Sequence, residues 1–474
     1  MPRQVGRPRS RRRLPGPPGR LHGPGARSPR SPRRRGVTAL VDTLRSLDIG
    51  AVPVATPTGR LVGAQGLLLE SVGCKLHTGQ RARVELVDGG WLDAQVVGFR
   101  DKVSYLMPFK KPQGLATGAR VLPEKNASKL MIGPSWLGRM VNGLGEEIDG
   151  LGRLGGDQPL ETTPPKVNPL RKAPVDEPLD VGVRAINSML TLGKGQRVGL
   201  MAGSGVGKSV LLGLITRQTV ADVVVVGLIG ERNREVREFV EKSLGPDGLK
   251  RAVLVVAPAD ESPMMRVMAT ELCHSIAAHF RDRGQNVLLL VDSLTRYAMA
   301  LREVALSLGE PPATRGYPPS VFSNLPQLVE SAGNGENPQG SMSAIYTVLA
   351  EGDDQQDPVV DTARAILDGH IVLTRELAER GHYPAIDVAQ SISRCMAQVV
   401  SPDHANAARK LKAALARHAR VRDLIPLGAY TPGADPETDR AVRLQPHIEA
   451  FLCQGTREGA PLDTCVTQLQ GMMA

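Results

Sequence analysis

Long hydrophobic runs, aromatic side chains and paired cysteines are all scarce in this chain of 474 residues. No apolar stretch approaches the roughly 18 residues that a membrane-spanning helix needs, so we expect no segment to cross a bilayer. The five cysteines are scattered and form no Cys-x-x-Cys pair. This pattern argues against a disulfide framework or a structural zinc site, and it is typical of a cytosolic protein.

Positive charge is also missing from most of the chain, although the net charge is +11. Residues 1–36 hold twelve arginines and no lysine or acidic residue, so they contribute +12 and the rest of the chain carries −1. A nearly neutral folded part gives no electrostatic reason to bind a polyanion, so we expect no nucleic-acid partner.

Residues 1–36 consist mainly of Arg, Pro, Gly and Ser. We expect them to be disordered because they bury too little apolar surface to fold, and they lack the apolar core of a secretory signal. Two interpretations stay open. The segment is a basic anchoring tail, or it is absent from the native product because translation begins near Val37, at a start codon that is read as valine inside a longer frame.

Residues 37–48 carry the pattern of a short amphipathic helix. Leu40, Val41, Leu44 and Leu47 recur with helical spacing and charged residues lie between them. So short a helix is marginal alone, so its apolar stripe packs either on its own domain or on a partner protein.

The remaining chain changes its periodicity twice. Between Arg60 and Pro123 short alternating strands are separated by turns such as residues 88–90, which predicts a small β-barrel. Beyond a Pro- and Gly-rich approach, continuous Val/Leu runs alternate with helical stretches, which predicts a parallel sheet covered by helices, and strand signals stop near Ser401. We therefore predict an α/β protein with five parts: a disordered extension (1–36), an amphipathic helix (37–48), a β-barrel (49–123), a parallel-sheet nucleotide domain (124–400) and a helical C-terminal domain (401–474).

The stretch 198–216 carries the strongest functional signal. An apolar strand leads into a glycine-rich turn, Lys208-Ser209 and an apolar helix, the order found in phosphate-binding loops, although Ala202 replaces the usual first glycine. Glycines let successive amide N–H groups face an anion at a helix N-terminus. We expect Lys208 to reach the β- and γ-phosphates and Ser209 to ligate Mg²⁺. The candidate nucleotide-binding residues are Gly203, Ser204, Gly205, Val206, Gly207, Lys208, Ser209 and Val210.

Two further apolar strands deliver acidic residues to the same edge of the predicted sheet. Asp292 ends one of them, where a carboxylate can hold magnesium together with Ser209. Glu231 ends the other and is our candidate to orient the attacking water, with a simple salt bridge to an arginine as the alternative. Arg232 either neutralises phosphate charge or holds Glu231 in place.

Three more candidates lie further along the chain. Tyr383, followed by proline, offers a ring that can stack on a nucleobase. Arg394 is a surface or ion-pair residue when the sequence alone is considered, although an arginine supplied by a neighbouring subunit can stabilise charge on a γ-phosphate. The segment from Glu351 to Asp354 is a candidate acidic cluster behind the site.

Five motifs stand out along the chain: residues 202–209, 230–236, 292–298, 316–322 and 383–387. Together they resemble the type III secretion ATPases, relatives of the catalytic subunit of rotary ATP synthases. The resemblance runs from about Val37 to the C-terminus, and residues 351–358 and 421–435 resemble the flagellum-specific protein-export branch more than the virulence branch.

The resemblance implies a homohexameric ring that hydrolyses ATP with Mg²⁺ at subunit interfaces and couples hydrolysis to the unfolding and delivery of export substrates. It implies these roles: Lys208 and Ser209 on phosphate and magnesium, Asp292 near magnesium, Glu231 as catalytic base, Tyr383 against adenine, and Arg394 as a finger that acts across the interface.

The same resemblance implies partners and a location. A stator-like regulatory protein would bind the N-terminal helix, which favours the partner interpretation of residues 37–48. The C-terminal helical domain would meet the export gate, the central stalk protein and chaperone–substrate complexes, at the cytoplasmic face of the inner membrane. Two departures are the Arg-rich extension and Asn233, which stands where the family often has glycine.

Other hypotheses remain open on the sequence. One is the ATPase of an injectisome, which differs in its export system only. A second is a ring RNA translocase of the transcription-terminator type, which needs a basic surface with aromatic side chains that residues 37–130 do not offer. A third is a non-catalytic nucleotide-binding subunit, against which Glu231 argues.

Overall fold

The computed structural model describes residues 57–124, 130–161, 168–203, 205–336, 340–349, 357–433 and 435–474. The chain divides into two units, residues 1–56 and 57–474. The predicted extension, the predicted helix at 37–48 and the acidic segment from Glu351 to Asp354 lie outside the described residues, so those interpretations stay predictions.

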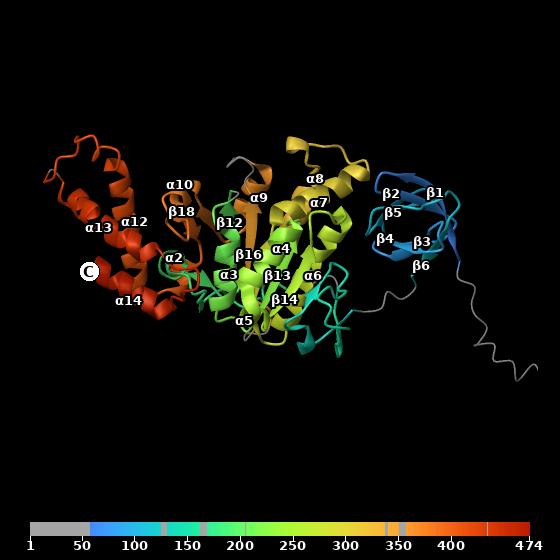
Figure 1. The fold of residues 1–474 in the computed structure, drawn as a ribbon, viewed down its shortest axis with the longest axis horizontal. Coiled ribbons are helices and arrows are strands. Elements are labelled where there is room, and N and C mark those ends of the chain that lie inside the picture. The colour runs from blue at the N-terminus through green and yellow to red at the C-terminus, as the bar shows by residue number, and fades with distance from the viewer. Residues whose placement is uncertain are drawn as a thin grey trace, which may run out of the picture. The chain divides into compact units, whose positions relative to one another are not determined.

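The first described part is a closed barrel of six strands (Figure 1). Alternate residues of β4, such as Leu92, Ala94 and Val96, are buried in its interior while their neighbours face outward. Pairing of the first strand with the last leaves no free edge, which protects the barrel from further strand pairing. The strands are β1 (Gly59–Gln65), β2 (Leu68–Val72), β3 (Arg81–Glu85), β4 (Trp91–Arg100), β5 (Val103–Pro108) and β6 (Arg120–Pro123).

The central part is an eight-stranded sheet in the order β18-β17-β12-β16-β15-β13-β14-β8. All neighbours run parallel except β17 and β18, so the carboxyl ends of the parallel strands share one edge. The strands are β8 (Met140–Val141), β12 (Arg197–Ala202), β13 (Val223–Ile229), β14 (Ala252–Ala257), β15 (Asn286–Asp292), β16 (Ser341–Leu349), β17 (Gly369–Leu373) and β18 (Ile386–Ser393). Short two-residue strands complete the set: β7 (Met131–Ile132), β9 (Gln158–Pro159), β10 (Pro178–Leu179) and β11 (Leu192–Gly193).

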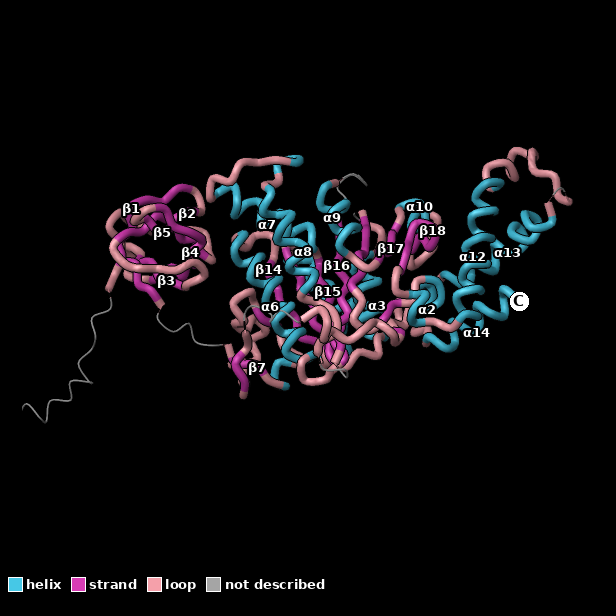
Figure 2. Tube along the Cα trace, turned by 180° about the vertical axis from the view of Figure 1, so that it is seen from behind, coloured by secondary structure: helices cyan, strands magenta, loops and turns pink. Residues whose placement is uncertain are grey.

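Both faces of this sheet are buried, as the continuous apolar runs predicted. Along β15, Leu289 and Val291 pack into one apolar cluster while Leu288 and Leu290 pack into the other. Four helices contribute to the first cluster: α6 (Pro263–Arg281), α7 (Leu294–Ser307), α8 (Pro319–Glu330) and α9 (Pro358–Ile366). Two others, α2 (Arg184–Met189) and α3 (Lys208–Gln218), contribute to the second. Figure 2 shows α6, α7 and α8 beside the strands. Short helices complete this part: α4 (Asn233–Glu238), α5 (Gly245–Leu249), α10 (Arg375–Glu379) and α11 (Met396–Val399).

Several helices begin at a capping residue followed by proline. The side chain of Ser262 accepts a hydrogen bond from the amide of Met265, and Ser401 caps the first C-terminal helix in the same way. A cap satisfies an amide that has no partner in the first turn, and proline at the next position loses nothing there because its N–H would be unpaired. Local sequence therefore sets where these helices start.

The C-terminal part holds three helices: α12 (Pro402–Val421), α13 (Pro436–Leu452) and α14 (Leu462–Met473). The sequence predicted the first two, and α14 is an addition. A connection between α13 and α14, residues 453–461, hydrogen-bonds to the segment before the sheet: the Gln454 side chain accepts from the Arg184 amide at 2.7 Å and donates to the Gly182 carbonyl at 2.8 Å. This connection brings C-terminal residues to the nucleotide domain.

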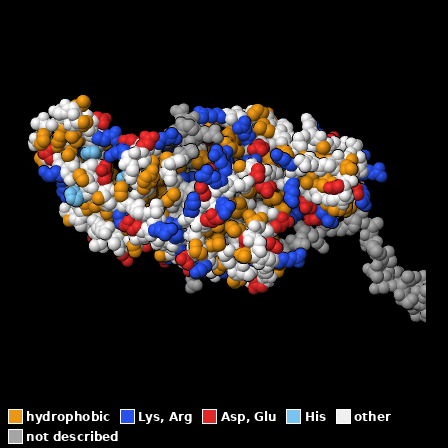
Figure 3. All heavy atoms as spheres, in the orientation of Figure 1, with side chains coloured by type: hydrophobic (Ala, Val, Ile, Leu, Met, Phe, Trp, Pro, Cys, Tyr) orange, Lys and Arg blue, Asp and Glu red, His pale blue; other side chains and the backbone are white. Residues whose placement is uncertain are grey.

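The distribution of charged side chains on the surface agrees with the nearly neutral composition of residues 37–474. On the face drawn in Figure 3, basic and acidic side chains are interspersed rather than separated into one basic surface. Within the described ranges, we find no helix that combines the length and the apolar character needed to cross a membrane.

Candidate active site

The glycine-rich loop joins β12 to α3 at the carboxyl edge of the sheet. Gly205 and Gly207 have φ angles of +80° and +91°, which side chains with a Cβ rarely adopt, so glycine is required at both positions. Ala202 is the buried last residue of β12, paired with β16 and β17 on either side. An extended residue needs no glycine, which explains why alanine is tolerated at that position.

Lys208, the first residue of α3, lies between two carboxylates from neighbouring strands. Its Nζ is 2.6 Å from Asp292 Oδ1 and 3.0 Å from Glu231 Oε1. The Thr347 hydroxyl donates to the same Asp292 oxygen at 2.6 Å. The structure thus brings together three of the residues predicted from the sequence, although Lys208 and Asp292 are more than eighty positions apart.

Burial dominates the electrostatics of this cluster. The side chains of Lys208 and Glu231 are 11% exposed, and that of Asp292 is 3% exposed. Burial raises the pKa of Asp292 and of Glu231, and the ammonium of Lys208 only partly opposes this. Burial alone would lower the pKa of Lys208, but the two carboxylates outweigh it and the net shift is upward. A buried carboxylate with a raised pKa is suited to accept a proton.

Glu231 and Arg232 follow β13, at the point where the chain turns into α4. Gly230, with φ of +69°, precedes them, and a Cβ there would lie 2.8 Å from the Arg296 side chain. Glu231 points into the cluster, whereas the Arg232 side chain is 85% exposed and lies 3.9 Å from Glu235. The structure therefore does not bring Arg232 to Lys208.

A cavity of about 340 Å³ opens beside the loop. The Tyr383 ring lies over the loop, since a Cβ on Gly207 would be 3.7 Å from it, and the residue is 45% exposed. Mostly apolar walls beside a phosphate loop suit a nucleobase. The cavity is lined by Gly205, Val206, Gly207, Val210, Leu211, Leu214, Leu373, Tyr383, Pro384, Ala385, Gln454 and Thr456.

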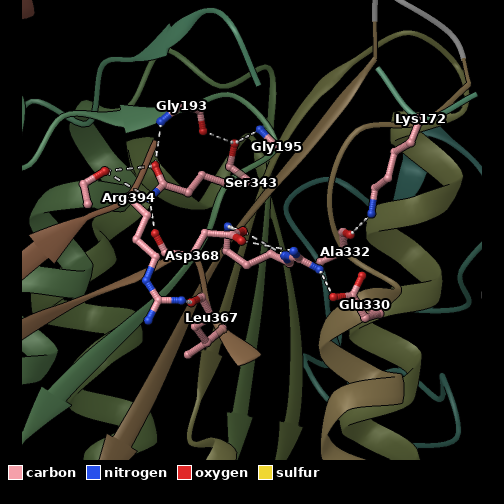
Figure 4. A network of polar contacts seen from close by, with 12 residues as sticks. Lys172, Gly193, Gly195, Glu330, Ala332, Ser343, Leu367, Asp368 and Arg394 are labelled. Atoms are coloured by element: carbon pink, nitrogen blue, oxygen red, sulfur yellow. Dashed lines mark hydrogen bonds and ion pairs between the residues drawn. The ribbon is translucent and has the colours of Figure 1, made fainter. Parts of the chain in front are cut away.

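Arg394 lies near the amino-terminal ends of the parallel strands, at the opposite end of the sheet from the loop. Ser393, just before it, pairs with Gly369 at the start of β17, whereas Leu373 at the end of β17 pairs with Ala202 beside the loop. At about 3.3 Å per residue, the length of β17 places roughly 13 Å between these two edges. The Arg394 guanidinium donates to the carbonyl of Leu367 at 3.1 Å (Figure 4). It also donates to the carbonyl of Arg364 at 3.2 Å. Arg394 therefore does not reach the loop of its own chain.

Sequence reasoning missed three residues of the site. Thr347 is a polar residue inside the buried strand β16, and a polar residue in an apolar run was the signal that the sequence offered. Gln454 and Thr456 line the cavity from a C-terminal connection that no sequence motif marks. Ser204 is outside the described residues, and Ser209 is half-buried in the first turn of α3.

Comparison with known proteins assigns this chain to a family. Residues 182–393 match the model of the ATP synthase alpha/beta family nucleotide-binding domain, and residues 400–471 match that of the T3SS EscN ATPase C-terminal domain. A flagellum-specific ATP synthase from Pseudomonas aeruginosa is 52% identical over 433 residues, which cover 90% of this chain and 95% of the relative. The chain belongs to the flagellum-specific ATP synthase family. The relative of the same name from Salmonella typhimurium is also 52% identical, with 89% of this chain and 96% of that protein covered.

Solved structures agree with this family. The assembled ATPase EscN of the enteropathogenic E. coli type III secretion system has a TM-score of 0.82 and 40% identity, covering 88% of this chain and 100% of EscN. EscN in complex with its central stalk EscO gives a TM-score of 0.81 with the same coverage. The predicted architecture of barrel, parallel-sheet domain and helical domain is confirmed.

Family membership also confirms the predicted activity class. The chain is an ATP hydrolase of the type III protein-export family. The flagellar interpretation fits the relatives with 52% identity better than the injectisome alternative, to which the 40% identical EscN structure belongs. The RNA translocase hypothesis receives no support from these relatives.

Proposed function

We propose that this protein works as a homohexameric ring that hydrolyses ATP between adjacent protomers and uses the energy to unfold and deliver flagellar export substrates. The observation that carries the proposal is the buried contact of Lys208 with Glu231 and Asp292 at the end of a phosphate-binding loop. The assembled state of EscN supports the ring.

Within each pocket, the loop residues 203–210 would surround the phosphates. When ATP binds, the Lys208 ammonium would turn from the two carboxylates towards the β- and γ-phosphates. Glu231 would orient the attacking water and accept its proton, since its carboxylate is buried and has a raised pKa. Tyr383 would stack on adenine at the apolar cavity. We propose a lesser role for Arg232, which would interact with phosphate charge only from an exposed position.

The oxygen donors of the pocket fit Mg²⁺. The carboxylate of Asp292 and the hydroxyl of Ser209 are hard oxygen ligands, the type that Mg²⁺ prefers, and both lie beside the loop. Bound there, the ion would neutralise phosphate charge. The residues of this chain would hold it and keep the Asp292 carboxylate oriented through Thr347.

Arg394 would complete the pocket of the neighbouring protomer. Its position at the far edge of the sheet excludes a role on the nucleotide bound to its own chain, and an arginine supplied in trans is a known way to stabilise developing γ-phosphate charge. The site is then shared, so catalysis depends on assembly.

The partners follow from the family. We propose a central stalk protein, by analogy with the EscN–EscO complex. A stator-like regulator at residues 37–48, chaperone–substrate complexes and the export gate at the C-terminal helices, and a cytoplasmic position against the inner membrane complete the proposal.

ATPase rate as a function of protein concentration tests the shared site. We expect the rate per subunit to rise steeply over the concentration range in which size-exclusion chromatography with light scattering shows assembly. Monomers that are too dilute to associate and that nevertheless turn over ATP at full rate would refute it.

A further inference from the structure

The segment that carries Arg394 is fixed to the start of the loop strand by one aspartate, Asp368, which precedes β17. The Asp368 carbonyl accepts the Arg394 amide at 3.0 Å. Its carboxylate accepts two hydrogen bonds from the Arg197 guanidinium, at 2.9 and 3.1 Å, and one from the Arg197 amide at 3.1 Å. Arg197 is the first residue of β12, whose other end is the phosphate loop.

Further contacts hold this junction in place. Arg197 also forms an ion pair with Glu330 at 2.6 Å, and its guanidinium is 15% exposed. The Gln196 side chain donates to the Asp368 carbonyl at 3.1 Å and to the Ser393 hydroxyl at 3.0 Å. In Figure 4, Asp368 lies beside Arg394, and Glu330 of α8 lies on the other side of the network.

We infer that Asp368 is a positioning residue for Arg394, with the Asp368–Arg197 pair setting where the arginine stands relative to the neighbouring pocket. The inference rests on the proposed trans role of Arg394. A bidentate arginine–carboxylate pair fixes both distance and plane, which a single contact does not. Arg197 begins β12, the strand that ends at the phosphate loop. The Asp368–Arg197 pair therefore also connects Arg394, which acts on the neighbouring protomer's pocket, with the loop of its own protomer.

The chain provides a control pair of the same type beside β8, the outermost strand on the other side of the sheet. Asp149 accepts two hydrogen bonds from Arg139, at 2.7 and 2.9 Å, and one from the Met140 amide at 3.0 Å. It also accepts a hydrogen bond from the Leu151 amide at 3.0 Å. Asp149 therefore repeats the bidentate arginine contact of Asp368, but beside β8, the strand furthest from β18 in the sheet. Asp368→Asn and Asp149→Asn remove the same charge from the same kind of pair.

The first test compares kinetics of these two variants in assembled protein. We expect Asp368→Asn to lower kcat about a hundredfold, the cost of displacing a catalytic group by about 1 Å. The KM for ATP and the affinity for a fluorescent ATP analogue should change less than about twofold, because each ATP is held mainly by the loop of the protomer that binds it. Asp149→Asn should retain wild-type kcat. Equal kcat values for the two variants would overturn the inference.

The second test uses mixed rings. Asp368→Asn protomers have an intact Glu231, and Glu231→Gln protomers have a correctly held Arg394, so mixing the two should restore activity several-fold above the average of the separate variants. Arg394→Ala mixed with Glu231→Gln should recover in the same way. Recovery with Arg394→Ala but not with Asp368→Asn would overturn the positioning role.

Absence of recovery with Arg394→Ala would instead refute the trans role in the proposed function, so the two failures are distinguishable. Arg197→Lys provides a second variant for the case in which Asp368→Asn does not fold, because an ammonium keeps the charge but not the bidentate geometry. It should reproduce the loss of kcat and the recovery in mixed rings, and wild-type kcat in Arg197→Lys would count against the pair.

Discussion

Replacing Glu231 by Gln isolates the proposed chemical step from nucleotide binding. The substitution keeps the size of the side chain and removes the group that would accept the proton of water. Lys208 retains Asp292 at 2.6 Å, so the ammonium stays paired and the loop should keep its structure. General-base catalysis contributes about 10²–10⁴ in rate. We therefore expect kcat to fall about a hundredfold or more, an increase of about 2.7 kcal/mol or more in activation free energy.

The same variant should change the pH dependence. Burial raises the pKa of Glu231, and the base works only when deprotonated, so wild-type activity should be present above that raised pKa and be lost as the pH falls through it. Glu231→Gln should lack this acid limb. ATP binding, measured with a fluorescent analogue, should stay nearly unchanged.

The assay is phosphate release from assembled protein across pH, with Glu238→Gln as the control. Glu238 is a partly exposed residue of α4 that pairs with Arg234 at 3.3 Å and Lys242 at 3.5 Å, and not with Lys208. Its variant should keep wild-type turnover and pH profile. If Glu231→Gln turned over ATP as fast as Glu238→Gln, Glu231 would have no part in the mechanism.

Three further predictions follow from the same contacts. Lys208→Ala should abolish measurable ATP binding, and it should lower the free energy of unfolding by about 3 kcal/mol because two buried carboxylates lose their cation. Burial raises the pKa of Asp292, so this loss of stability should shrink as the pH falls and the carboxylate is protonated. Chemical denaturation at two pH values checks it. Asp292→Asn should raise the Mg²⁺ concentration for half-maximal activity about tenfold, whereas an unchanged Mg²⁺ titration would remove Asp292 from the metal site. Tyr383→Ala should raise the KM for ATP about tenfold with little change in kcat, while Tyr383→Phe keeps the stacking face and should match wild type.

Local sequence was sufficient wherever a residue's role depends on its immediate neighbours. Gly205 and Gly207 were predictable because a loop that wraps a phosphate needs positive φ, which glycine adopts without strain. The buried strands were predictable because a sheet covered on both faces selects continuous apolar runs. The acids Glu231 and Asp292 were predictable because parallel strands end at a common edge.

Contacts between distant segments were not available from the sequence. Gln454 and Thr456 reach the cavity beside the loop because the connection between α13 and α14 hydrogen-bonds to residues 180–187, about 270 positions earlier. The position of Arg394 depends on β18 running antiparallel to β17, which carries its end away from the loop.

The sequence by itself determined the phosphate loop, the strand-end carboxylates and the barrel–sheet–helix order, because each follows from spacing along the chain. Only the tertiary structure decided that Lys208 sits between Glu231 and Asp292, that a C-terminal connection lines the cavity, and that Asp368 joins Arg197 to Arg394. Strand order and register create these neighbours, and neither is encoded in the periodicity of a single strand.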